Sequence, residues 1–194
     1  MLSPRIVLVR HGQSTWNAEG RLQGQADPPL SKLGRQEAAG LRGALRGFPA
    51  DRVLTSDLRR ARETAAALGH PDAVPDATWR EIDVGEWSGR LLADLPAGPE
   101  PAWRGGDLLP PGGERWEELE ARVADAVDAL ATRDGEWLVV THGGVIRAAV
   151  AYVTGADAQR IAGPANASVT VVEPARLLAF GWTPDGGVPG LSPL

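Results

Sequence analysis

Two histidines in this sequence each follow an apolar run and precede a glycine. Arg10-His11-Gly12 comes directly after residues 6–9, and His142-Gly143-Gly144 comes directly after residues 137–141. A neutral imidazole is a nucleophile, whereas a guanidinium group such as that of Arg10 matches the oxygens of a phosphate dianion. Arg60 adds a second guanidinium. Two arginines and two histidines that converge on one crevice would therefore bind a phosphoryl group and stabilise the charge that develops during its transfer.

The apolar runs before these histidines predict strands that bring them together. Residues 6–9 are four consecutive branched apolar residues, a pattern typical of a strand buried on both faces. In open α/β sheets, ligands bind beyond the carboxyl ends of the strands. If strands 6–9 and 137–141 are neighbours, His11 and His142 share one pocket. Arg60 lies in the first turn of a predicted helix, where free backbone N–H groups favour an anion at the same rim.

The rest of the chain alternates predicted strands and helices. This alternation predicts a mainly parallel sheet that is covered on both faces, in one domain over 1–194. The expected helices are 32–47 after Ser31, 58–68 after a start signal at 55–57, 114–133 and 145–153, and the further strands are 52–54, 168–172 and 176–181. The apolar stripe of the first helix is expected to consist of Leu33, Ala38, Leu41 and Leu45.

Composition excludes several classes of function. The 194 residues are 43% apolar and 23% charged, which is typical of a globular protein, and no apolar run is long enough for a membrane helix. The chain has no cysteine, so disulfides, thiolate metal sites and a cysteine nucleophile are excluded. The net charge of −5 argues against a nucleic-acid or anionic-membrane surface. We therefore expect a cytoplasmic protein whose partner is a small molecule.

Residues 90–113 are rich in proline and glycine and lie between segments that resemble core. We interpret them as a short irregular insertion near the active site rather than as a linker between domains. Trp103, like Trp87 and Trp116, is of a type that more often packs than stacks on a substrate, and contact of Trp103 and Arg104 with a leaving group is the alternative. The loop after Gly24 is the other segment expected to select the substrate.

Four blocks of the sequence, in order and spanning almost the whole chain, resemble those of the histidine phosphatase superfamily, in the branch that contains cofactor-dependent phosphoglycerate mutases and their phosphatase relatives. The resemblance implies a three-layer α/β/α fold and a reaction through phosphohistidine, with no metal and no other cofactor. The blocks are residues 8–17 (LVRHGQSTWN), 56–65 (SDLRRARETA), 81–89 (EIDVGEWSG) and 140–147 (VTHGGVIR).

The resemblance also implies roles for single residues. His11 would be the nucleophile and Glu81 the proton donor, selected over the nearby Asp83 and Glu86 by the register of the family motif alone. Gly143 would offer a backbone N–H. The residues implied to bind the phosphate or line the substrate are Arg10, Asn17, Gln23, Gly24, Arg60, His142 and Gly143.

A phosphoryl transfer through phosphohistidine requires the same residue types. His11 must be neutral on its attacking nitrogen, and the charges of Arg10 and Arg60 help to keep it so. Glu81 can protonate the leaving alkoxide if burial or the arriving dianion raises its pKa, and it can then deprotonate the attacking water. His142, if protonated, would neutralise phosphate oxygens. An isolated His11 would more often be a structural histidine. The sequence lacks the close pairing of its three histidines that a metal site needs.

A phosphatase fits this sequence better than a mutase. A mutase must keep water from its phosphohistidine, which calls for additional chain over the pocket. Here the 90–113 insertion is short and residues 181–194 contain no basic side chain. Gly112-Gly113-Glu114 resembles a phosphatase-branch segment, although Arg115 stands where serine often follows.

We therefore predict a monomeric or homodimeric phosphomonoesterase that acts on a small phosphorylated metabolite, such as a sugar phosphate, a phosphoglycerate derivative or a nucleotide-like monoester. A phosphoglycerate mutase is the first alternative. A catalytically silent module that binds a phosphorylated ligand is the second, and it is disfavoured because neither His11 nor Glu81 is replaced.

Overall fold

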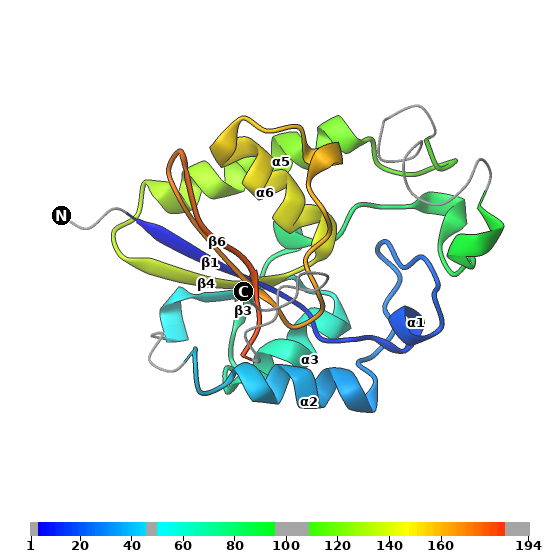
Figure 1. Ribbon diagram of the computed structural model, residues 1–194, viewed down its shortest axis with the longest axis horizontal. Helices are drawn as coiled ribbons and strands as arrows, with labels where there is room; N and C mark the ends of the chain where they lie inside the picture. Colours follow the sequence, from blue (N-terminus) through cyan, green and yellow to red (C-terminus); the bar gives the residue numbers. More distant parts are fainter. Residues whose placement is uncertain (1–3, 46–49, 96–108, 185–194) are drawn as a thin grey trace, which may run out of the picture.

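The computed structural model describes residues 4–45, 50–95 and 109–184, in which a six-stranded sheet has helices on both faces (Figure 1). The strand order is β3-β2-β4-β1-β5-β6. The first four strands in this order run parallel, whereas β5 is antiparallel to β1 and to β6. The predicted three-layer α/β/α fold with a mainly parallel sheet is confirmed. The strands are β1 (Arg5–Arg10), β2 (Val53–Thr55), β3 (Val74–Pro75), β4 (Glu136–Thr141), β5 (Val169–Glu173) and β6 (Arg176–Trp182).

Two pairs of helices cover the sheet. In Figure 1, α5 and α6 lie over one face, and α2 and α3 lie over the other. Successive side chains of a strand point to opposite faces, so Val139 of β4 packs into the core under α5 and α6, while Val140 packs into the core under α2 and α3. The helices are α1 (Thr15–Ala18), α2 (Lys32–Leu41), α3 (Arg59–Leu68), α5 (Trp116–Ala131) and α6 (Gly143–Thr154), with short 3₁₀ helices η1 (Ala50–Arg52), η2 (Ala77–Trp79), η3 (Gly85–Trp87), η4 (Leu92–Asp94) and η5 (Ala158–Arg160).

The central pair β1 and β4 positions the two histidines. The two strands are parallel neighbours, and Arg10 of β1 pairs with Thr141 of β4. The backbone N–H of His11 donates to the carbonyl of Thr141 at 2.9 Å, which extends the pairing beyond the strand end. His11 and His142 therefore leave the sheet side by side, as predicted from the two apolar runs.

Each of the four predicted helices begins or ends differently in the structure. The helix predicted at 58–68 begins at Arg59, the one at 114–133 covers Trp116–Ala131, and the one at 145–153 extends over Gly143–Thr154. Helix α2 ends at Leu41, and residues 42–45 form a turn; the predicted extension at 46–49 lies outside the described residues. Leu33, predicted on the buried stripe of α2, is 49% exposed. Gly34 faces the protein instead, because at this point α2 packs directly against backbone. Ser56 does not cap α3, which begins after Leu58 without a side-chain cap.

None of the helices in the described ranges is long and apolar enough to cross a membrane.

The contact of Gly34 with the loop after β1 yields a prediction about stability. A Cβ atom at Gly34 would lie 2.0 Å from the carbonyl oxygen of Gln13, whereas a Cβ at Gly40, on the same helix, would meet nothing within 4 Å. Gly34→Ala should lower the free energy of unfolding by about 1–3 kcal/mol or more, because backbone must move. Gly40→Ala should raise it by roughly 0.5–1 kcal/mol through helix propensity. Urea unfolding of both variants measures the two changes in the free energy of unfolding. Equal changes would contradict the prediction that Gly34, but not Gly40, packs against backbone.

Candidate active site

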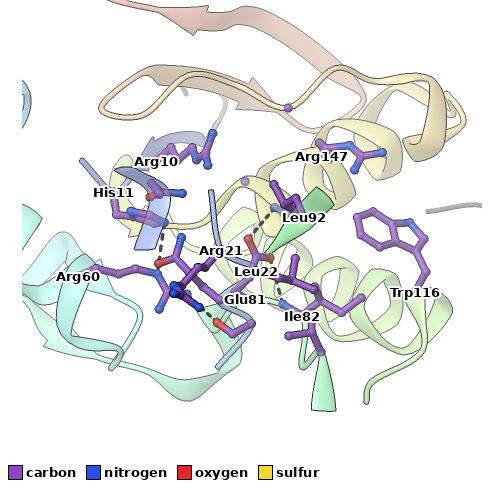
Figure 2. Close-up of a pocket in the computed structure, with 17 residues that line it drawn as sticks. Arg10, His11, Arg21, Leu22, Arg60, Glu81, Ile82, Leu92, Trp116 and Arg147 are labelled. Atoms are coloured by element: carbon purple, nitrogen blue, oxygen red, sulfur yellow. Dashed lines mark hydrogen bonds between the residues drawn. The ribbon is translucent and has the colours of Figure 1, made fainter. Parts of the chain in front are cut away.

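A pocket opens where β1 and β4 end, next to the N-terminus of α6. Figure 2 shows His11 and Arg60 at one end of it, Glu81 between the ends, and Trp116 and Arg147 at the other end. The predicted site residues that line the pocket are Arg10, His11, Asn17, Gln23, Gly24, Arg60, Glu81 and Gly143. His142 lies behind them, with its ring centroid 5.2 Å from that of His11. The structure thus brings together residues from all four blocks of the sequence.

One ring nitrogen of His11 forms a hydrogen bond with the backbone, which fixes the tautomer of the ring. Its side chain is buried, and Nδ1 lies 2.7 Å from the carbonyl oxygen of Gly12, an acceptor that requires the proton on Nδ1. Nε2 then carries the lone pair, and it accepts a hydrogen bond from Nε of Arg60 at 3.3 Å. Burial, followed by the charges of Arg60 and Arg10, lowers the pKa of His11 well below the usual 6.5. Nε2 is therefore an unprotonated nitrogen that faces the pocket.

Arg60 is a buried cation anchored by backbone carbonyls. Its Nη1 donates to Ala26 and its Nη2 to Gly24, both at 2.7 Å. Burial lowers its pKa to about 10, opposed by the charges of Glu81 and Asp27, so that it stays protonated at neutral pH. Arg10 donates to the carbonyl of Pro164. These bonds hold the two guanidiniums in place before any anion arrives.

Glu81 lies across the pocket from His11 and is attached to the start of α6. Its Oε2 accepts the backbone N–H of Gly144 at 3.1 Å, and its Oε1 accepts that of Ile82 at 3.0 Å. A Cβ atom at Gly144 would lie 2.3 Å from Oε1, so the glycine is what makes room for the carboxylate. Neither Asp83 nor Glu86 lines the pocket. Of these three carboxylates, the geometry therefore favours Glu81.

A small polar network places Asn17 and Gln23 at the pocket wall. Ser14 is the N-cap of α1 and forms a capping box with Asn17, while its hydroxyl donates to Oε1 of Gln23 at 2.7 Å. Asn166 donates to the backbone carbonyl of His11 at 3.0 Å. Gly24 has a φ of +51°, and a Cβ there would lie 2.5 Å from the side chain of Val84. Only glycine can therefore present its carbonyl to Arg60 in this way.

The outer part of the pocket contains residues that sequence reasoning did not assign. Arg147 stacks over the ring of Trp116, with its Cζ 4.9 Å from the ring centroid. From the sequence, Trp116 is interpreted as a packing residue. Leu92 belongs to the predicted 90–113 insertion, whereas Trp103 and Arg104 lie outside the described residues. The unassigned lining residues are Arg21, Leu22, Ile82, Val84, Leu92, Trp116, Gly144, Arg147 and Gly163.

His142 is neutral in this structure rather than the cation considered from the sequence. It is completely buried, and burial, followed by the charges of Arg60 and Arg10, lowers its pKa well below 6.5. With two guanidiniums already in the site, a third positive charge is costly. His142 therefore offers one N–H donor rather than a full charge.

Within the described ranges, no cluster of three or more histidine, cysteine, aspartate or glutamate side chains is arranged to hold a metal ion.

The comparison with known families decides what kind of protein this is. The model of the histidine phosphatase superfamily (branch 1) matches residues 6–177. The chain belongs to this superfamily. The predicted resemblance is confirmed, and each of the four blocks contributes residues to the pocket.

Relatives in the superfamily include phosphatases and a mutase. A glucosyl-3-phosphoglycerate phosphatase of Mycolicibacterium vanbaalenii is 36% identical over 78% of this chain and 74% of its own length. A metal-independent phosphoserine phosphatase of Arabidopsis thaliana is 37% identical over 86% and 75%. A probable phosphoglycerate mutase of Salmonella paratyphi C is 33% identical over 92% and 89%. Phosphatases are thus well represented among the similar proteins.

Solved structures of the superfamily share the fold. A mycobacterial glucosyl-3-phosphoglycerate phosphatase, in complex with VO3, superposes with a TM-score of 0.75 at 33% identity, over 86% of this chain and 91% of that protein. A phosphoglycerate mutase from Thermus thermophilus superposes with a TM-score of 0.75 at 34% identity, over 91% and 97%. One architecture therefore carries both kinds of enzyme.

The two buried neutral histidines make stability depend on pH. In the unfolded chain each imidazole binds a proton near its usual pKa of about 6.5, whereas in the folded chain His11 and His142 resist protonation. Above about pH 7.5 the two histidines contribute no pH dependence. As the pH falls below about 6.5, they should reduce the free energy of unfolding by up to about 1.4 kcal/mol per pH unit each.

Urea unfolding between about pH 8 and 5 measures this dependence. Because carboxylates also titrate at the lower end, the relevant quantity is the difference in slope between the unmodified protein and His11→Gln or His142→Gln. Each variant should show a shallower decline. The same slope in all three proteins would contradict the assignment of neutral histidines.

Proposed function

We propose that this superfamily member is a metal-independent phosphomonoesterase that hydrolyses a small phosphorylated metabolite through a phosphohistidine on Nε2 of His11. The proposal rests on the protonation state and the surroundings of Nε2 of His11. Nδ1 is committed to Gly12, Nε2 is buried and unprotonated, and Arg60 lies beside it. This is the arrangement that a nitrogen nucleophile for phosphorus needs.

The proposed reaction has two steps. Nε2 of His11 attacks the phosphorus, the bond to the ester oxygen breaks, and protonated Glu81 gives its proton to the leaving alkoxide. Glu81, now a carboxylate, removes a proton from water, and the resulting hydroxide attacks the phosphohistidine. The P–N bond breaks, inorganic phosphate leaves and His11 is neutral again. Arg10 and Arg60, with the backbone N–H of Gly143 at the N-terminus of α6, stabilise the transferring phosphoryl oxygens.

The outer pocket supports a leaving group with some apolar surface. Leu22, Ile82, Val84, Leu92 and Trp116 provide apolar atoms there, and Arg21 lies at the same wall. Two similar proteins are named for phosphorylated metabolites, glucosyl-3-phosphoglycerate and phosphoserine. A compact phosphorylated metabolite is the substrate class that agrees with both observations.

A phosphoglycerate mutase is the second candidate, because a probable mutase of 33% identity aligns over 92% of this chain. The silent binding module is less well supported, since both His11 and Glu81 line the pocket.

We also propose that the chain is a single domain, supported by the presence of β1 and β6 in one sheet. The cytoplasmic location and the monomeric or homodimeric state stay predictions.

Release of phosphate from p-nitrophenyl phosphate tests the hydrolase. The protein should release nitrophenol with excess EDTA present, and His11→Ala should lower the rate by at least about 10³-fold, because the nucleophile is removed. His70→Ala is the matched control, since His70 does not line the pocket. Activity retained in His11→Ala, or lost to EDTA and restored by a metal, would contradict the mechanism.

The same preparation separates hydrolase from mutase. Incubation with 3-phosphoglycerate and a catalytic amount of 2,3-bisphosphoglycerate should release inorganic phosphate, or leave the substrate unchanged, rather than form 2-phosphoglycerate. Rapid isomerisation would favour the mutase. Phosphorylated metabolites ranked by kcat/KM would then identify the leaving group.

Glu81→Gln tests the proton donor. An alkyl phosphate such as phosphoserine needs its leaving oxygen protonated, so its turnover should fall by about 10²-fold or more, with a much smaller change in KM. Nitrophenolate leaves without a proton, so p-nitrophenyl phosphate should still phosphorylate His11 in this variant. The result should be a burst of nitrophenolate that stops after one turnover, because no carboxylate activates water to hydrolyse the phosphohistidine. Asp83→Asn is the control, because Asp83 lies outside the pocket. Near-normal turnover of phosphoserine, if it is a substrate, or of the best alkyl phosphate found, would contradict the role of Glu81.

A further inference from the structure

Ser56 makes a contact in the site that neither the pocket lining nor the family motif assigns. It follows β2 directly, is completely buried, and places its Oγ 2.8 Å from Nε2 of His142. Its hydroxyl oxygen also accepts the backbone N–H of Leu58 at 3.3 Å. The opposite nitrogen of the ring, Nδ1 of His142, is buried and has no hydrogen-bond partner among the described residues.

The direction of the bond between Ser56 and His142 follows from counting hydrogens. If the Ser56 hydroxyl donates to Nε2, the oxygen can still accept from Leu58, and only the N–H on Nδ1 is left without a partner. If Nε2 donates instead, both the hydroxyl hydrogen and the lone pair of Nδ1 are left buried and unsatisfied. A buried polar group without a partner is destabilising, so the arrangement that leaves one such group is favoured over the arrangement that leaves two.

We infer that Ser56 is a positioning residue: its hydroxyl donates to Nε2 of His142 and so fixes the neutral ring with its hydrogen on Nδ1, where it awaits an oxygen of the phosphoryl group. The inference rests on the proposed function, which supplies that oxygen. His142 stands beside His11 and directly before Gly143, which lines the pocket at the start of α6. The buried Nδ1–H of His142, which has no partner among the described residues, is thus next to the place where the anion is expected.

The uncharged hydroxyl is the suitable partner in this position. A carboxylate on Nε2 would favour the imidazolium, which would add a third positive charge to Arg10 and Arg60. It would also oppose the binding of a phosphate dianion with its own negative charge. A serine directs the hydrogen to Nδ1 without changing the charge of the site, so His142 can donate one hydrogen bond while it stays neutral.

The tautomer of His142 can be measured directly. In ¹⁵N-labelled protein, the two ring nitrogens of His142 should show the hydrogen on Nδ1, and Ser56→Ala should move it to Nε2 or give a mixture. Ser56→Thr keeps a hydroxyl and should restore the original tautomer. Thr55→Val is the matched control, because Thr55 is the neighbouring buried hydroxyl residue and its hydroxyl donates to the carbonyl of Ser56 rather than to the His142 ring. A hydrogen on Nε2 in the unmodified protein would overturn the inference.

Binding of orthovanadate and turnover of p-nitrophenyl phosphate give a second readout. Ser56→Ala should weaken vanadate binding and lower kcat/KM by about 10-fold, the effect of one lost hydrogen bond, and Ser56→Thr should recover most of this. If Ser56→Ala and Ser56→Thr lose activity equally while the tautomer is unchanged, Ser56 has only a packing role. If His11→Ala keeps its activity while the tautomer is as inferred, the proposed function fails but the Ser56 contact stands.

Discussion

The parallel pairing of β1 with β4 is the constraint on which the rest of the site depends. Two strands in the middle of a sheet end at the same edge, and the bond from the His11 N–H to the Thr141 carbonyl continues their register by one step. Both histidines are buried at this edge. Burial is also the largest cause of their lowered pKa values. The neutral charge state of the rings is therefore a direct consequence of their place in the sheet.

The strand ends and their chemistry could be predicted because they depend on local patterns. Apolar runs followed by His-Gly predict where buried strands release polar side chains, and the alternation of elements predicts the layers. The contacts that depend on backbone approach could not be predicted in this way. Leu33 fits a periodic stripe, yet the helix packs through Gly34, because the loop after β1 lies too close for any side chain. Apolar periodicity does not detect contact between two backbones.

Ser56 and Glu81 show that sequence patterns alone also fail to predict some contacts within the site. Ser56 lies in a segment that predicts a helix start, and its contact with His142 is set by the neighbouring positions of β2 and β4 in the sheet. Among Glu81, Asp83 and Glu86, residue type cannot choose, since all are carboxylates close together in sequence. The choice follows from the position of the chain against Gly144, which only the folded structure shows. The family motif selects Glu81 as the expected proton donor, whereas it includes Ser56 without assigning it a role.

Glycine at position 144 has a mechanical consequence. The carboxylate of Glu81 is tied to the first turn of α6, and the backbone N–H of Gly143 in that same turn is available to the phosphoryl group. In the proposed reaction, this hydrogen bond thus fixes the group that protonates the ester oxygen against the helix turn that holds the phosphoryl oxygens. A small shift of the segment around residue 81 relative to the sheet would be resisted by the helix. In the proposed reaction, the alignment of acid and phosphate therefore depends on this contact between the segment around residue 81 and α6, and not on the residues of the outer pocket.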